Sequence, residues 1–260
     1  AYGDGYPTVP MRRGFYTGRR TFPYLHDIDD RGSAPNTLGW HAIPGTQTTL
    51  AETLSERGVM TGLVTALYHL FKPTMNFTRG FVSHQFIRGQ ETDRLRSGPI
   101  ARIDLKAHLH PQETDLKRHG GLLQYLLNVQ DRACEEDYFA SVLFRQAARW
   151  LDDNAGQRPF MLWVASFTPQ EFWDPPKPYA DKYFKKEGLV DYCCPQFFMS
   201  RFPFSPDEIR RSKALYYGYC TFMDRWIGHL FEKLDEHRLW DETIVVLTSD
   251  HGTELLDRDR

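Results

Sequence analysis

Long apolar runs are missing from this sequence of 260 residues. No stretch approaches the roughly 20 consecutive apolar residues that a membrane-spanning helix requires, and no signal peptide is visible. The formal net charge is only -2, so there is no electrostatic reason to expect nucleic acid or an acidic membrane as a partner. The sequence therefore predicts neither kind of partner, and it leaves the localisation and the oligomeric state open.

Cysteine is also scarce, and internal repeats and low-complexity segments are absent. Neighbouring Cys193 and Cys194 do not indicate a disulfide framework, and no CxxC pair suggests a zinc site. Hydrophobic residues make up 41% of the chain and charged residues 25%, which is ordinary for a globular protein. A chain of this length can bury a sizeable core as a single domain.

A run of β-branched and apolar residues from Thr243 to Thr248 predicts a strand buried on both faces of a parallel sheet. Asp250 and His251 follow it, at the end of the strand where open α/β sheets place their sites. A carboxylate oxygen and an imidazole nitrogen are ligands that divalent metals accept. A surface turn after a core strand is the alternative interpretation.

A second polar group lies near the start of the chain. Thr8 can N-cap a short helix, with Pro10 in its first turn and Gly18 as a left-handed stop. The Thr8 hydroxyl would lie in the positive field of the helix N-terminus, with Arg12 one turn on, and this field favours an anion. The alternative is a capped surface helix with solvated arginines.

The segments between these groups predict alternating helices and strands. Thr49 and Glu52 form a capping box that opens a helix, and His69 follows the strand after it. A single His in that position is more often structural than catalytic. The helix-then-strand order favours a parallel α/β architecture. The remaining expected elements are a strand over 59–67, a loop-rich region over 79–132, a helix over about 135–154, a strand over 160–167 and a long helix from 205 to the turn before Asp241.

These motifs together resemble the sulfatase family of the alkaline phosphatase superfamily. The family signature Cys(or Ser)-x-Pro-Ser-Arg, with Thr-Gly-Arg five residues on, aligns without a gap to residues 8–12 and 17–19. The resemblance runs from residue 5 to residue 260 and includes His69 and Asp250-His251-Gly252. It implies an alkaline-phosphatase-like three-layer α/β sandwich, a mostly parallel sheet with helices on both faces, as one catalytic domain over 1–260.

The resemblance implies a hydrolase of sulfate, phosphate or phosphonate esters in small molecules or glycans. Thr8 occupies the nucleophile position, Arg12 would stabilise charge, and His69 would contact the oxyanion or help the leaving group. Asp250 and His251 would bind one divalent metal ion. Family members usually carry Ca²⁺, although the His ligand also allows Zn²⁺ or Mn²⁺.

Several positions depart from the family pattern. Thr8 replaces the Cys or Ser that sulfatases convert to formylglycine, so formylglycine is not expected, and phosphate or phosphonate chemistry is favoured. Gln170 replaces a substrate-contacting His, and it can donate a hydrogen bond but cannot transfer a proton. Gln170 and Lys72 are the predicted substrate-binding residues, and Leu67 replaces an active-site Lys. The alternative function is therefore a catalytically silent homologue that acts as a binding or structural module.

The two ends of the chain also differ from the family pattern. Family members begin with a strand that ends in two adjacent Asp residues, which supply further metal ligands, and they end with a smaller subdomain. Neither feature occurs between Ala1 and Arg260. We therefore expect this chain to be the interior of a longer protein.

Overall fold

The computed structural model describes residues 5, 7–21, 39–71, 75–195 and 202–256. The chain divides into two compact units, and each is described by itself. The sheet unit comprises residues 1–86, 147–165 and 233–253. The helical unit comprises residues 87–146, 166–232 and 254–260.

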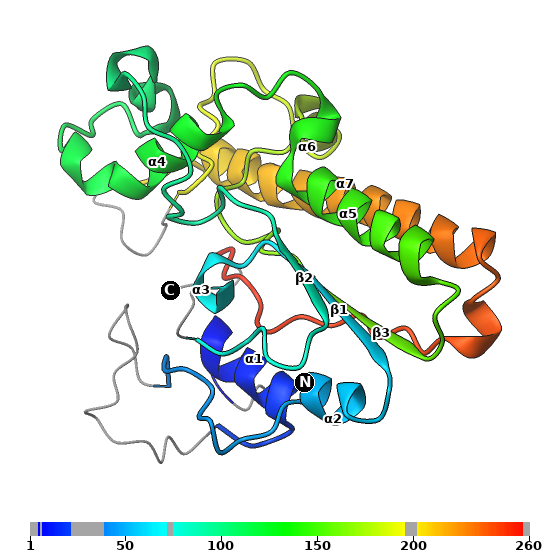
Figure 1. The fold of residues 1–260 in the computed structure, drawn as a ribbon. Helices are drawn as coiled ribbons and strands as arrows, with labels where there is room; N and C mark the ends of the chain where they lie inside the picture. The colour runs from blue at the N-terminus through cyan, green and yellow to red at the C-terminus, as the bar shows by residue number, and fades with distance from the viewer. Residues whose placement is uncertain (1–4, 6, 22–38, 72–74, 196–201, 257–260) are drawn as a thin grey trace. The chain divides into compact units, whose positions relative to one another are not determined.

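The sheet unit is built on a three-stranded parallel sheet in the order β2-β1-β3 (Figure 1). The strands are β1 (Met60–Thr65), β2 (Ser83–Phe86) and β3 (Phe160–Ala165). Gly62 of β1 pairs with Ser83 on one side and with Leu162 on the other. The central strand is buried from Thr61 onward, as expected for a parallel strand covered on both faces. The predicted strands over 59–67 and 160–167 are confirmed.

Helices cover both faces of this sheet. A Cβ on Gly62 would lie only 2.3 Å from the ring of Trp150 in α5 (Phe139–Asn154), so α5 packs on the face of Gly62 and its register partner Leu162. Trp163 points to the other face, because neighbouring residues of a strand alternate. There it meets Tyr16 of α1 (Thr8–Thr17), with ring centroids 4.4 Å apart. The predicted helix–sheet–helix layering is confirmed in this unit.

The capping box before β1 forms as predicted. The Thr49 hydroxyl accepts a hydrogen bond from the Glu52 backbone N–H at 3.1 Å, and the Glu52 carboxylate accepts one from the Thr49 N–H at 2.8 Å. These bonds satisfy donors that helix α2 (Leu50–Ser55) would otherwise leave open at its N-terminus. Gly58 follows with φ +80° and turns the chain into β1.

The N-terminus of α1 differs by one residue from the prediction. Thr8 is the first helical residue and Pro7 is the N-cap, with no side-chain capping bond. Pro10 lies in the first turn, where a missing N–H costs no intrahelical hydrogen bond, so it is compatible with a helix that begins at Thr8. Gly18 ends the helix with φ +64°, and its N–H binds the Gly14 carbonyl, so the predicted left-handed stop is confirmed.

The predicted buried strand over 243–248 is wrong. No strand forms there within the described residues, and the side chains of Ile244, Val246 and Leu247 are 92%, 77% and 76% exposed. The β-preference of such residues reflects packing and pairing with neighbouring strands rather than the backbone alone. The segment pairs with none of β1, β2 and β3, so its apolar side chains remain in solvent.

The helical unit contains most of a long helix, α7 (Pro206–Glu236). The start of this helix at residue 206 matches the prediction. Five elements formed in the region predicted to be loop-rich. They are strand β2, which is polar, helix α4 (Gly120–Val129), which opens on two glycines, and three short 3₁₀ helices between residues 100 and 119. The described parts of the chain contain no helix long and apolar enough to cross a membrane. The shorter helices are α3 (Tyr68–Phe71), α6 (Lys177–Asp181), η1 (Ile100–Arg102), η2 (Leu105–His108), η3 (Leu116–His119), η4 (Glu135–Asp137) and η5 (Trp240–Glu242).

Candidate active site

The structure brings together the two polar groups found at opposite ends of the sequence. Thr8 Oγ1 lies 3.3 Å from His251 Nε2. Arg12 Nε donates a hydrogen bond to Asp250 Oδ2 at 2.8 Å, which is also an ion pair. Four predicted site residues therefore form one cluster in the sheet unit.

Helix α1 presents its two members of this cluster from one face. Thr8 and Arg12 are one turn apart, and residues at this spacing are neighbours on a helix surface. Thr8 is 6% exposed, and the side chains of Arg12 and Asp250 are 13% and 12% exposed. Such burial strengthens electrostatic interactions. The positive N-terminal end of the helix adds to the charge of Arg12, so the cluster suits an anionic ligand.

Local hydrogen bonds orient Asp250 and His251. Asp250 Oδ1 accepts a hydrogen bond from the His251 backbone N–H at 3.1 Å. His251 Nδ1 lies 2.9 Å from the Gly252 carbonyl oxygen, and because a carbonyl only accepts, this contact assigns the proton to Nδ1. In a neutral ring Nε2 then carries a lone pair. That nitrogen faces the Thr8 hydroxyl and can accept its proton.

These residues do not make a metal site by themselves. A divalent ion held firmly by a protein takes about four to eight ligands. The cluster offers one carboxylate and one imidazole, and both are engaged by Arg12 and Thr8. Among the described residues there is no group of three or more His, Cys, Asp or Glu side chains that could hold an ion.

His69 is linked to the same region through an aromatic contact. It lies in α3, directly beyond the carboxyl end of β1. Its ring packs against Trp40, with centroids 5.0 Å apart and planes at 74°. His41, which follows Trp40 in the chain, is in contact with the Arg13 guanidinium of α1. Trp40 was not predicted as a site residue, because a single aromatic residue in a loop carries no recognisable spacing.

The structure describes two of the three remaining positions. Lys72 lies outside the described residues. Gln170 belongs to the helical unit, where its backbone N–H donates to the Phe167 carbonyl at 3.2 Å, and its substrate-binding role stays a prediction. Leu67 is 1% exposed, and its N–H donates to Thr65 Oγ1 at 3.1 Å. An apolar core side chain therefore stands where many family members carry a Lys.

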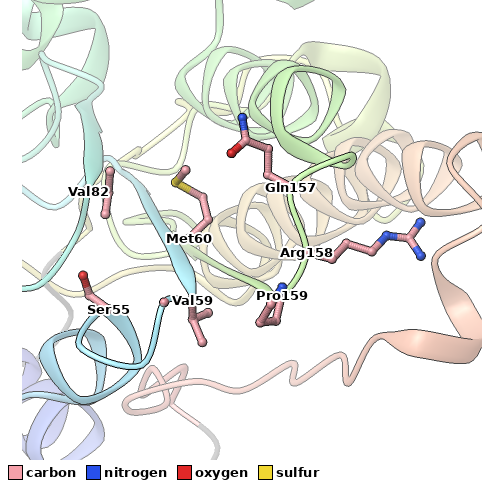
Figure 2. Close-up of a pocket in the computed structure, with 8 residues that line it drawn as sticks. Ser55, Val59, Met60, Val82, Gln157, Arg158 and Pro159 are labelled. Carbon is pink, nitrogen blue, oxygen red and sulfur yellow. The ribbon is translucent and has the colours of Figure 1, made fainter.

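A hollow of about 280 Å³ lies at the opposite end of the strands, beside the start of β1. Figure 2 shows the side chain of Arg158 extending away from this hollow, and Arg158 forms an ion pair with Glu242. The hollow therefore lacks the converging polar groups of the Thr8 cluster and is the weaker candidate. Its lining residues are Ser55, Gly58, Val59, Met60, Val82, Gln157, Arg158 and Pro159.

Solved structures with the same fold are enzymes of the alkaline-phosphatase-like class. The chain is similar to the phosphonate monoester hydrolase SpPMH from Silicibacter pomeroyi, with a TM-score of 0.61 and 20% identity over 97% of this chain and 55% of that one. The phosphonate monoester hydrolase of Agrobacterium radiobacter gives a TM-score of 0.59 at 12% identity, covering 92% and 52%. At these identities the likeness establishes the fold, which is the alkaline-phosphatase-like sheet with helices that the sequence predicted.

The Sulfatase family profile matches residues 1–259, and the chain belongs to the sulfatase family. An arylsulfatase of Clostridium perfringens is 31% identical over 118 residues, which are 38% of this chain and 23% of the relative. The multifunctional alkaline phosphatase superfamily protein PehA of Trinickia caryophylli is 46% identical over 50 residues, 19% and 10% of the two chains. The chain thus spans about half the length of the solved relatives and matches a smaller part of the curated ones.

Proposed function

We propose that this chain carries the nucleophile of a hydrolase acting on sulfate, phosphate or phosphonate esters. The observation that carries the proposal is the contact between Thr8 Oγ1 and His251 Nε2 at 3.3 Å, beside the Arg12 guanidinium. A hydroxyl next to a proton acceptor and a fixed cation is what displacement at a tetrahedral oxyanion needs. Family membership supports the same reaction class.

In the proposed reaction, Thr8 Oγ1 attacks the sulfur or phosphorus of the ester. A bond forms from Oγ1 to that atom, the bond to the leaving oxygen breaks, and the Thr8 proton passes to His251 Nε2. Arg12 uses Nε to hold Asp250, and its terminal nitrogens make no hydrogen bond in the described parts of the chain. They are therefore able to bind the equatorial oxygens. His69 donates a proton to the leaving oxygen. Water then attacks the sulfur or phosphorus, the bond from that atom to Oγ1 breaks, His69 takes a proton from the water, and His251 returns its proton to Thr8.

The relatives support esters of small molecules or glycans as substrates. They include a choline-sulfatase of Rhizobium meliloti, 25% identical over 139 residues, which are 48% of this chain and 27% of the relative. A solved structure of Ps i-CgsB in complex with k-i-k-neocarrahexaose is similar with a TM-score of 0.54 and 18% identity, covering 90% of this chain and 46% of that one. An unmodified Thr8 favours phosphate or phosphonate esters, because formylglycine is not expected from Thr.

Dependence on one divalent metal is a further part of the proposal. Asp250 and His251 are the ligands that this chain would contribute, as oxygen and nitrogen donors suited to Ca²⁺, Mn²⁺ or Zn²⁺. Because Nδ1 carries the proton, His251 would bind the ion through Nε2, and this would replace its role as the acceptor of the Thr8 proton. Such an ion would supply a positive charge for the ester oxygens. Any stable site needs ligands beyond these two residues.

A catalytically silent homologue is the second candidate function. It is favoured by Gln170 and Leu67, which replace groups that transfer protons or carry charge in the family pattern. Such a protein would keep the fold and bind an anionic ester at α1 without cleaving it.

Assays with a set of chromogenic esters distinguish the hydrolase from the catalytically silent homologue. The parent, Thr8→Ala and Thr8→Ser are assayed with aryl sulfate, phosphodiester and phosphonate ester substrates, with and without added divalent metals. We expect parent activity, loss in Thr8→Ala by a factor of at least about 10³, and partial activity in Thr8→Ser. Thr17→Ala, which removes another hydroxyl of α1, is the matched control. Equal rates for Thr8→Ala and the parent would remove Thr8 from the mechanism, and ester binding without turnover in the parent would favour the silent homologue.

A further inference from the structure

We propose that Trp40 is a substrate-binding residue, whose indole N–H donates a hydrogen bond to an oxygen of the anionic ester beside His69. This proposal rests on the proposed function, because it assigns Trp40 to the same anion. Its ligand class is a sulfate, phosphate or phosphonate group.

Trp40 is connected to the candidate site through contacts of its own ring and of its chain neighbour His41. Its ring packs edge to face with His69 at a centroid distance of 5.0 Å, and its neighbour His41 contacts Arg13 of α1. Arg13 follows Arg12, which holds Asp250. A short chain of contacts thus connects the indole ring to both the candidate leaving-group residue and the anion-binding helix.

The hydrogen bonding of Trp40 is incomplete. The residue is 8% exposed, its Nε1 atom is fully buried, and this nitrogen has no hydrogen-bond partner among the described residues. An indole nitrogen can only donate, and a buried donor without an acceptor is costly. The indole N–H therefore needs an acceptor. The positive charges of Arg12 and Arg13 favour an anion in this role, and we assign it to an ester oxyanion bound between Arg12 and His69.

A second tryptophan provides a matched comparison. Trp226 in the helical unit is 4% exposed, and its Nε1 is also buried, with no hydrogen-bond partner in the part of the chain that the structure describes. Its ring lies 5.0 Å from that of His229. The His229 side chain, however, is 56% exposed and paired with the Glu232 carboxylate at 2.6 Å. The negative charge of Glu232 disfavours an anion there, so the two indoles differ in the chemistry around them.

The first experiment compares Trp40→Phe with Trp226→Phe. Phenylalanine keeps an aromatic ring but removes the N–H. Dissociation constants for inorganic sulfate and phosphate are measured by calorimetry, together with KM and kcat for the best ester. We expect Trp40→Phe to weaken anion binding by about tenfold or more, the effect of losing a hydrogen bond to a charged group. Trp226→Phe should leave it unchanged.

The second experiment follows the indole signals of the parent protein, and the variants serve only to assign them. The chain has six Trp residues, so the ¹H–¹⁵N spectrum contains six indole signals, and the signal missing in Trp40→Phe identifies Trp40. If the other five indole signals keep the positions that they have in the parent, the variant is folded. In the parent, we expect the Trp40 signal to move downfield as phosphate or sulfate saturates the site, while the Trp226 signal stays in place.

The outcomes separate this proposal from the one on which it rests. If the parent binds the anion while the Trp40 signal does not move, or if Trp40→Phe binds it as tightly as the parent, the assignment of Trp40 is overturned and the proposed hydrolase stands. If the parent neither binds sulfate or phosphate nor cleaves any ester, both proposals are wrong.

Discussion

Two segments supply the candidate site, and they are held in very different ways. Helix α1 is anchored by apolar packing: Val9 is 0% exposed and Tyr16 is 2% exposed. The segment before Asp250 has almost no such anchor, since Ile244 is 92% exposed and Val246 is 77% exposed. Asp250 and His251 nevertheless reach α1, through contacts with Arg12 and Thr8.

The difference separates the roles of the two segments. On the α1 side, the fold itself fixes the position of the hydroxyl and the guanidinium. On the other side, polar contacts made by the site residues position the carboxylate and the imidazole. Substitutions in the packing of α1 should therefore affect stability first, whereas substitutions at the contacts should affect activity with little effect on stability.

The largest effect is expected at the packed end of α1. Tyr16→Ala removes a buried ring that meets Phe77 and Trp163 at centroid distances of 4.9 and 4.4 Å. Loss of a large buried side chain leaves a cavity, so the free energy of unfolding should fall by about 3–5 kcal/mol. Urea denaturation measures it. Tyr217→Ala, at a side chain that is 39% exposed, is the control, and a loss below about 1 kcal/mol for Tyr16→Ala would show that α1 is not anchored in this way.

The next effect concerns the contact between the segments. Arg12→Met keeps much of the apolar stem but removes the charge that faces Asp250, so kcat for the best ester should fall by about 10²- to 10³-fold. The melting temperature should change little, because the segment before Asp250 is weakly packed and lets the Asp250 carboxylate turn to solvent when Arg12 is lost. Arg19→Met, at an exposed residue beyond the helix, is the control. Rates within twofold of the parent would remove Arg12 from the site.

A smaller effect is expected from the charge of the capping box. Burial raises the pKa of Glu52, but hydrogen bonds from Thr49 and Arg79 and the charge of Arg79 outweigh it, so its pKa is lowered overall. A lowered pKa stabilises the fold above the unfolded value of about 4.3, and this contribution disappears as the pH falls through the folded pKa.

Glu52→Gln tests this charge while keeping a side chain that can complete a capping box. Near neutral pH the variant should be less stable than the parent by less than about 1 kcal/mol, since the pair with Arg79 is partly exposed. The gap should close as the pH is lowered below about 4. A gap that is constant between pH 7 and pH 3 would mean that the charge of Glu52 does not matter.

The smallest effect is expected in the exposed segment. Replacing Ile244, Val246 and Leu247 together by Ser removes no buried contact, so the free energy of unfolding should stay within about 0.5 kcal/mol per site. A combined loss above about 3 kcal/mol in thermal or urea denaturation would indicate that these side chains are packed in solution.

Local signals in the sequence predicted much of the fold. The capping box at Thr49 and the left-handed turn at Gly18 depend on nearby atoms only, so their residue types identify them. Strand β2 was missed because its sequence is polar, and its position depends on pairing with β1. The segment 243–248 was misjudged for the related reason that strand formation needs a partner, which an apolar pattern cannot supply.

The candidate site was predictable only in part. Thr8, Arg12, Asp250 and His251 were identified by motif, and the structure brings them together. Trp40 could not be identified from a motif, because the evidence for it is a ring contact with His69 and a buried N–H that has no partner among the described residues. Both features arise from the three-dimensional arrangement of residues distant in sequence.

The exposed segment has a practical consequence for handling the protein. Residues 243–248 are six consecutive uncharged residues without Pro, most of them β-branched, which is the composition of segments that pair between chains. Purified chains should therefore self-associate through this segment as their concentration rises, with sedimentation coefficients that increase accordingly. Introducing a lysine at Val246 would act as a gatekeeper against this pairing and would keep solutions monodisperse enough for calorimetry and NMR.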